Sequence, residues 1–111
     1  MLLKFENQEN FENIIKNSEN LYVIVDFYAE WCKPCKKLSP IIDNMIDKFD
    51  ELDFIKVDAD INDDIADTYS INELPTILVF STKNLEIEER FNINSTDDME
   101  KQIYNLCKKY D

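Results

Sequence analysis

Two cysteines three positions apart, Cys32 and Cys35, carry the most distinctive chemistry in this chain. Side chains three residues apart on a helix have Cβ atoms about 5–6 Å apart, and a disulfide joins Cα atoms about 4.4–6.8 Å apart. The two thiols can therefore form a bridge with little movement of the backbone. Because this bridge closes a very short loop, it constrains the unfolded chain only weakly and has little structural value. The spacing favours a reversible redox pair.

Three lysines, Lys33, Lys36 and Lys37, surround this pair in a chain whose formal net charge is -12. The partial positive charge and unpaired N–H groups of a helix N-terminus favour the thiolate form of a cysteine placed there, and the lysines act in the same direction. We predict that Cys32 is the attacking thiolate and Cys35 the resolving thiol. The alternatives are two ordinary thiols on a helix, or a metal site shared between chains.

Asp26 is the second unusual residue, because it interrupts LYVIVDFY (residues 21–28), a segment that is otherwise apolar on both alternating faces. An isolated buried carboxylate is costly, so the pKa of Asp26 should rise. A carboxyl group of this kind near thiols can accept and return protons as a disulfide opens and closes. Lys56 lies on the strand expected to neighbour Asp26. The alternative is that Asp26 reaches the rim of the sheet and water.

The hydrophobic pattern alternates between strand and helix periodicity, and it shows which elements position these residues. We expect strands at residues 2–5, 21–28, 53–58, 76–81 and 85–92, and helices at residues 8–17, 33–49 and 61–69, followed by a last helix that begins at Ser95. The order βαβαβαββα predicts an α/β fold, a central mixed sheet flanked by helices. Chemistry in such sheets gathers beyond the carboxyl ends of the strands, which is where Cys32 follows the segment 21–28.

The last helix raises two further expectations. Ser95 is a suitable N-cap, with Asp97 and Asp98 in the first helical turn. Cys107, the third cysteine, falls on the apolar stripe of this helix and is expected in the core. A regulatory thiol is the alternative for Cys107.

The composition excludes several kinds of site. The chain has no histidine, which rules out Cys–His and Ser–His nucleophile pairs, and its three cysteines are too few for a four-cysteine zinc site within one chain. It also lacks glycine, which rules out Gly-rich phosphate loops. The net charge of -12 argues against nucleic acid and against anionic membrane surfaces as partners. We therefore expect no metal site and no bound cofactor.

The N-terminal residues suggest where the protein works. They lack the apolar run of roughly 7–15 residues of a signal peptide, and no segment approaches the roughly 20 apolar residues of a membrane span. We expect a soluble, cytoplasmic, monomeric protein of 111 residues, the size of one domain. In a reducing compartment a close cysteine pair is more often catalytic or metal-binding than structural.

Three segments, VDFYAEWCKPCKKLSPIID, FIKVDAD and INELPTILVF, resemble the thioredoxin family over about residues 21–81. The positions that match the family are Asp26, Trp31, Cys32, Pro34, Cys35, Pro40, Lys56 and Pro75. The resemblance implies that residues 1–111 form a single thioredoxin domain with a WCKPC active site. It implies a thiol-disulfide oxidoreductase that reduces protein disulfides.

The resemblance also implies roles for individual residues. Cys32 attacks the substrate disulfide, Cys35 resolves the mixed disulfide, and Asp26 assists proton transfer to Cys35. Pro75 is implied to follow a cis peptide bond and to face the cysteines. The groove for an extended substrate segment is implied to be lined by Trp31, Leu74 and Thr76. A thioredoxin reductase would return the oxidised form to the dithiol with NADPH, a cofactor that belongs to that partner.

Three positions depart from the family pattern. Lys33 replaces the usual glycine between the cysteines, and together with Pro34 it is expected to tune the couple. Stabilising the reduced state makes a couple more oxidising, so we expect a modest shift in that direction. Glu73 stands where the family often has a small residue, which affects substrate choice. Asn92 stands near the position of a turn glycine, and asparagine tolerates positive φ; Asn92 is also expected to line the substrate groove and to narrow it by a side chain.

Two other functions remain open at this point. The first is a more oxidising disulfide oxidase or isomerase, for which Lys33 is the only support. The second is a binding or assembly module in which the thiols need not turn over, because one fold can serve several functions.

Overall fold

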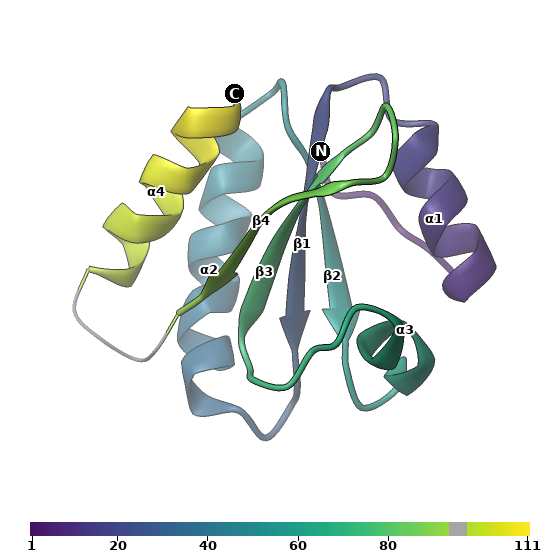
Figure 1. Cartoon of the computed structure of the whole chain (residues 1–111). Helices are drawn as coiled ribbons and strands as arrows, with labels where there is room; N and C mark the ends of the chain where they lie inside the picture. Colours follow the sequence, from purple (N-terminus) through teal and green to yellow (C-terminus); the bar gives the residue numbers. More distant parts are fainter. Residues whose placement is uncertain (94–97) are drawn as a thin grey trace.

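Helices and strands alternate along the chain much as the hydrophobic pattern predicts (Figure 1). The computed structural model describes residues 1–93 and 98–111. The helices are α1 (Gln8–Lys16), α2 (Lys33–Lys48), α3 (Asp63–Thr68) and α4 (Met99–Tyr110), and the strands are β1 (Tyr22–Tyr28), β2 (Asp53–Asp58), β3 (Thr76–Ser81) and β4 (Ile87–Asn92).

The four strands form one mixed sheet in the order β2-β1-β3-β4. β1 pairs with β2 in parallel and with β3 antiparallel, and β3 pairs antiparallel with β4. β1 therefore lies between two neighbours, as its apolar residues on both faces predict. The α/β class and the helix-flanked mixed sheet expected from the sequence are confirmed.

Each face of the sheet is covered by two helices. On one face, Ile24 of β1 and Phe54 of β2 pack in the same cluster as Leu38 and Ile42 of α2 and Ile103 of α4. On the other face, Val23, Val25 and Phe27 of β1 pack with residues of α1 and α3. Because side chains alternate along a strand, Asp26 lies on the α2 side of the sheet, two residues beyond Ile24.

The strand expected at residues 2–5 is absent from the structure, so the element order begins with α1. Leu2 forms a single parallel bridge with Phe54, in which the Leu3 N–H donates to the Phe54 carbonyl oxygen (2.7 Å). The chain then turns toward α1, where the rings of Phe5 and Phe11 pack edge to face at 5.4 Å. This aromatic contact draws the segment away from β2 before a ladder of hydrogen bonds can form.

Residues before α3 also differ from the prediction. Ile61 was expected on the apolar face of this helix, but its side chain is 78% exposed and the helix begins at Asp63. The Asp58 carboxylate accepts hydrogen bonds from the N–H groups of Asp60 (3.0 Å) and Ile61 (3.3 Å). These bonds hold the chain in a turn, as Asp side chains often do, and they delay the start of the helix.

The starts of β4 and α4 also differ from the prediction, because a residue before each element has a positive φ. Leu85 adopts a positive φ of 60° in the turn before β4, so the strand begins at Ile87 rather than at residue 85. Asp98 has φ 65° and precedes α4 as its N-cap, so it does not lie in the first helical turn. Ser95 and Asp97, for which capping roles were predicted, lie outside the described residues.

Candidate active site

Cys32 and Cys35 form a disulfide at the start of α2, with Cα atoms 5.3 Å apart. Cys32 is the N-cap of the helix, with extended backbone angles (φ -87°, ψ 111°), and its Sγ accepts a hydrogen bond from the Cys35 N–H (3.3 Å). Both residues are only 4% exposed. The predicted placement of the pair, bridgeable and at a helix N-terminus beyond the carboxyl end of β1, is confirmed.

The charge around the pair is positive on the helix side. Lys33, Lys36 and Lys37 are all exposed on the first turns of α2, and the first turn carries no acidic residue. The helix dipole and these ammonium groups both favour a thiolate at Cys32 when the bridge is open.

Asp26 is buried at the middle of the sheet, with 3% of its surface exposed. Burial raises the pKa of this carboxyl group from 3.8 to about 7, while Lys56 opposes the rise and Asp43 adds to it. Among the described residues, Asp26 Oδ1 has no hydrogen-bond partner. The predicted rise in pKa is supported, and the alternative, in which Asp26 reaches water at the rim of the sheet, is wrong.

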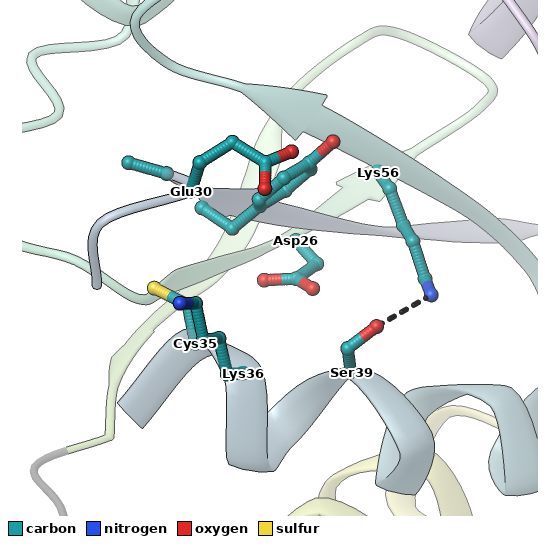
Figure 2. A pocket seen from close by; sticks show the side chains of 8 residues that line it. Asp26, Glu30, Cys35, Lys36, Ser39 and Lys56 are labelled. Atoms are coloured by element: carbon teal, nitrogen blue, oxygen red, sulfur yellow. Dashed lines mark hydrogen bonds between the residues drawn. The ribbon is translucent and has the colours of Figure 1, made fainter. Parts of the chain in front are cut away.

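Asp26 and Cys35 line the same pocket between the sheet and α2, with a volume of about 290 Å³ (Figure 2). The other lining residues are Tyr28, Ala29, Glu30, Lys36, Ser39 and Lys56. Figure 2 shows the Asp26 carboxyl group between β1 and α2, on the side from which Cys35 and Ser39 project. The arrangement gives the second cysteine a neighbouring acid that can hold or release a proton near neutral pH.

Lys56 lies beside Asp26 in the β1–β2 register, as expected. Its Nζ, however, donates to Ser39 Oγ (3.1 Å, Figure 2) and forms an ion pair with Asp43 Oδ1 (2.7 Å). Ser39 and Asp43 are not among the residues predicted from the sequence. Their spacing of four residues places them on one face of a helix, and this signal, combined with the position of α2 over β2, could have identified them.

The loop before β3 and the first residue of that strand contain three of the predicted groove residues, Leu74, Pro75 and Thr76. The Leu74–Pro75 peptide bond is cis, as the resemblance implies. Leu74 packs against the small cluster formed by Ala29, Cys32 and Cys35. Thr76 is buried and donates through its hydroxyl group to the Glu73 carbonyl oxygen (2.5 Å), which ties the two ends of the loop together.

Trp31 stands directly before the first cysteine and is 68% exposed, which is unusual for so large a side chain. Its indole N–H donates to Asp60 Oδ2 (2.8 Å). This hydrogen bond fixes the ring on the surface beside the disulfide, where it presents an apolar face to solvent.

Asn92 differs from its prediction. It is the last residue of β4, pairs with Thr76 and has no positive φ, so the expected glycine-like turn at this residue is wrong. Its side-chain N–H group donates to Glu73 Oε2 (2.7 Å) and Thr76 Oγ1 (3.3 Å). The pairing of β3 and β4 includes Asn92, and its amide holds the Glu73 carboxylate at the edge of the loop.

Cys107 lies in the core between α4 and the sheet, with no exposed surface. Burial raises the pKa of its thiol to about 12. A thiol that stays protonated and inaccessible reacts slowly, so the structure favours the predicted core role over that of a regulatory thiol.

The described part of the chain contains neither a metal-binding cluster nor a helix that could span a membrane. Over residues 1–93 and 98–111, no group of three or more His, Cys, Asp or Glu side chains is arranged to hold a metal ion. In the same residues, no helix has the length and apolar character needed to cross a membrane.

A dithiol that opens and closes at a helix start, beside a buried acid, has the chemistry of a thiol-disulfide oxidoreductase. Comparison with known proteins agrees: residues 3–105 match the thioredoxin family model. Thioredoxin H2 of Arabidopsis thaliana is 35% identical over 108 residues, which cover 95% of this chain and 79% of that protein. A thioredoxin of Chlamydia trachomatis is 31% identical over 102 residues, covering 92% and 96% of the two chains.

Solved structures show the same architecture. A Plasmodium falciparum thioredoxin superimposes with a TM-score of 0.81 at 30% identity and covers 99% of this chain and 98% of its own. Trichomonas vaginalis thioredoxin gives a TM-score of 0.82 at 26% identity, with coverage of 100% and 96%. The chain belongs to the thioredoxin family. It has the thioredoxin fold, and it is an oxidoreductase that acts on protein disulfides through Cys32 and Cys35.

Proposed function

We propose that this protein works as a protein-disulfide reductase in which Cys32 attacks and Cys35 resolves. The observation that carries the proposal is the asymmetry of the two cysteines. Cys32 caps α2 beside exposed Lys33 and Trp31, whereas Cys35 lies inside the helix and lines the pocket that contains Asp26. The first thiol therefore has the environment of a thiolate, and the second has the environment of a group that must lose a proton.

The proposed reaction has two displacements. The Cys32 thiolate attacks one sulfur of the substrate disulfide, which breaks the substrate S–S bond, forms a mixed disulfide and releases one substrate thiolate that takes a proton. Asp26, as the carboxylate, then accepts the proton of the Cys35 thiol. The Cys35 thiolate attacks Cys32 Sγ, closes the Cys32–Cys35 bond and releases the second substrate thiolate, which takes the proton held by Asp26. The substrate gains two electrons and two protons, and the enzyme is oxidised.

The remaining site residues have supporting roles in this proposal. Leu74, Pro75 and Thr76 form one wall of the substrate groove and Trp31 the other, while Asn92 fixes the loop from β4. Lys33 and Pro34 tune the thiols, and Lys56 acts on Asp26. The match over residues 3–105 supports the prediction that residues 1–111 form one domain.

We also propose that a thioredoxin reductase using NADPH restores the dithiol, that no cofactor is bound by this chain itself, and that the protein carries electrons as a monomer in the cytoplasm. Family membership supports the link to a reductase. The strongly acidic surface supports a soluble, separate molecule.

Reduction of insulin disulfides with dithiothreitol as the electron source tests the activity. The wild-type protein and Cys107→Ser should both be active, and Cys32→Ser should be inactive. Cys35→Ser should instead trap substrate proteins on Cys32 as mixed disulfides. A folded but inactive wild-type protein would contradict the proposal, and trapping on Cys35 in Cys32→Ser would reverse the assignment of the two roles.

A more oxidising oxidase or isomerase is the second candidate, because Lys33 is exposed beside Cys32 and stabilises the reduced form. A reduction potential near about -120 mV would favour this function, whereas a value near about -270 mV would favour the reductase.

A further inference from the structure

Asp26 and Lys56 lie opposite each other on adjacent parallel strands, yet they do not form an ion pair. Their Cα atoms are partners in the β1–β2 register, and both side chains lie on the α2 face of the sheet. Neighbouring strands are about 4.8 Å apart, so the long lysine side chain can reach across to the carboxyl group. Within the described part of the chain, however, the only ion pair of Lys56 is with Asp43.

The geometry explains this choice of partner. Asp43 is on α2 one helical turn beyond Ser39, which lines the pocket, and the Asp43 side chain is 60% exposed, whereas the Lys56 side chain is 21% exposed. An exposed carboxylate stays ionised with little desolvation cost, but a buried carboxylate must lose its hydration to attract a cation. Ser39 Oγ, one helical turn before Asp43, provides a second acceptor for the ammonium group at 3.1 Å. Asp43 and Ser39 therefore compete successfully for Lys56.

We propose that Asp43 is a positioning residue of the redox reaction: together with Ser39 it holds the Lys56 ammonium group at the rim of the pocket and leaves Asp26 without a close counter-ion. The inference rests on the proposed role of Asp26 in proton transfer and deepens it. A carboxyl group without a close cation keeps its proton up to neutral pH, where it can exchange that proton with Cys35.

Other charged groups near Asp26 are part of the same balance. The groups that face it are Lys56 on β2, Cys35, Lys36 and Asp43 on α2, and Tyr28 and Glu30 at the end of β1 and in the following loop, while β3 contributes the apolar Ile77. Burial is the largest cause of the raised pKa of Asp26, Lys56 lowers it and Asp43 raises it further. Asp43 can therefore act on this balance in two ways, by placing the Lys56 ammonium group and by its own repulsion of the Asp26 carboxylate.

The test is Asp43→Asn, with the pKa of Asp26 followed by carboxyl-carbon NMR in the reduced and oxidised protein. We expect the released ammonium group to approach Asp26 and to lower its pKa by roughly one unit. The pH profile of insulin reduction should move to lower pH by a similar amount. Asp47→Asn is the matched control, because Asp47 is an exposed acidic residue one turn further along α2. It should change neither quantity.

The background Lys56→Met separates positioning from simple repulsion between the two carboxylates. In the Lys56→Met background, Asp43→Asn should lower the pKa of Asp26 by less than half of the fall that it causes when Lys56 is present. An unchanged pKa in Asp43→Asn, or an equal fall in both backgrounds, would overturn the inference. If the pKa falls as expected but the pH profile stays in place, Asp43 positions Lys56 as proposed and it is the role of Asp26 in proton transfer that fails.

Discussion

At the scale of single residues, Asp26 is the position where stability and chemistry conflict. A carboxyl group that is 3% exposed, with a pKa of about 7, must be ionised at higher pH inside the sheet. Ionising a buried group costs free energy that an unfolded chain does not spend. The central strand therefore contains a carboxyl group that can exchange a proton with a thiol but that destabilises the folded state when it is ionised.

Asp26→Asn should consequently stabilise the protein in a pH-dependent manner. The carboxyl group titrates near 3.8 when unfolded and near 7 when folded, so the native state binds more protons in between and loses stability as the pH rises through this window. Above pH 7 the loss is complete. Asp26→Asn should raise the free energy of unfolding by roughly 3–4 kcal/mol more at pH 8 than at pH 4. Urea denaturation at the two pH values measures this difference, and equal effects would show that Asp26 is not buried as the structure has it.

Lys33 gives a second prediction at this scale. Lys33→Gly removes one exposed positive charge beside Cys32, so the thiolate of the reduced form loses some stabilisation. We expect the reduction potential to become more negative by about 10 mV, the size of an exposed charge effect of about 0.5 kcal/mol in a two-electron couple. Equilibration with a glutathione or dithiothreitol buffer measures the shift. Lys37→Gly, which changes the same charge further along α2, should have a smaller effect, and an equal effect would contradict a specific role for Lys33.

The site residues that could be predicted from the sequence are those whose type is unusual for the segment in which they lie. Cys32 and Cys35 are a close pair in a chain with few cysteines, and Asp26 is a charge in an apolar strand. Ser39 and Asp43 are ordinary polar residues on a helix, and their spacing places them on one face without distinguishing them from other polar residues of α2. Their role depends on α2 crossing β2 at Lys56, which is a tertiary relationship that the local pattern does not contain.

At the scale of elements, the loop before β3 is joined to β4 through the Asn92 side chain. This amide donates to Glu73 Oε2 and to Thr76 Oγ1, so it restrains a carboxylate that would otherwise move freely on the surface. A restrained charge next to the proposed groove discriminates between substrates more strongly than a mobile one, because less side-chain entropy is lost on binding.

Glu73→Gln should therefore change the choice of substrate rather than the chemistry. For a disulfide peptide with a lysine next to the reacting cysteine, kcat/KM should fall by about 2- to 5-fold, the value of an exposed ion pair. A neutral peptide should react as with the wild type. Glu88→Gln on the exposed side of β4 is the control and should affect neither peptide. A similar loss with both peptides would show that Glu73 supports the loop and does not select substrates.

The strands β1, β2 and β3 were predicted within one residue of their bounds, because an apolar run between polar turns indicates a buried strand and marks both of its ends. The segments that were predicted wrongly are short and weakly patterned. Residues 2–5 have the composition of a strand but are drawn away by the contact between Phe5 and Phe11. The start of β4 depends on a positive φ at Leu85 that its residue type does not suggest.

At the scale of the whole molecule, the net charge of -12 creates a negative field around an active site that is locally positive. This field attracts cationic partners over distances comparable to the Debye length, about 10 Å in 0.1 M salt. The exposed lysines at the start of α2 therefore form a small positive region on an otherwise acidic surface.

The rate of reaction should depend on salt according to the charge of the substrate. Raising NaCl from about 0.05 to about 0.5 M should lower kcat/KM roughly 3- to 10-fold for a cationic disulfide peptide and raise it for an anionic one. Stopped-flow measurements with the tryptophan fluorescence of Trp31 can follow both reactions. Identical salt dependence for the two peptides would show that the local lysines, and not the overall charge, govern the encounter.

The outer strand of the sheet has a consequence for the behaviour of the protein in a crowded solution. β4 pairs with β3 on one side only, carries Glu88, Glu89 and Arg90, and meets β3 with a shift in register between Val79 and Phe80. Free strand edges tend to recruit strands from other molecules, and charges and irregular pairing oppose this tendency. A redox protein that acts on the disulfides of other chains brings this strand edge near those chains at each encounter. The charges and the irregular pairing of β4 therefore oppose the addition of a strand from another chain at this edge.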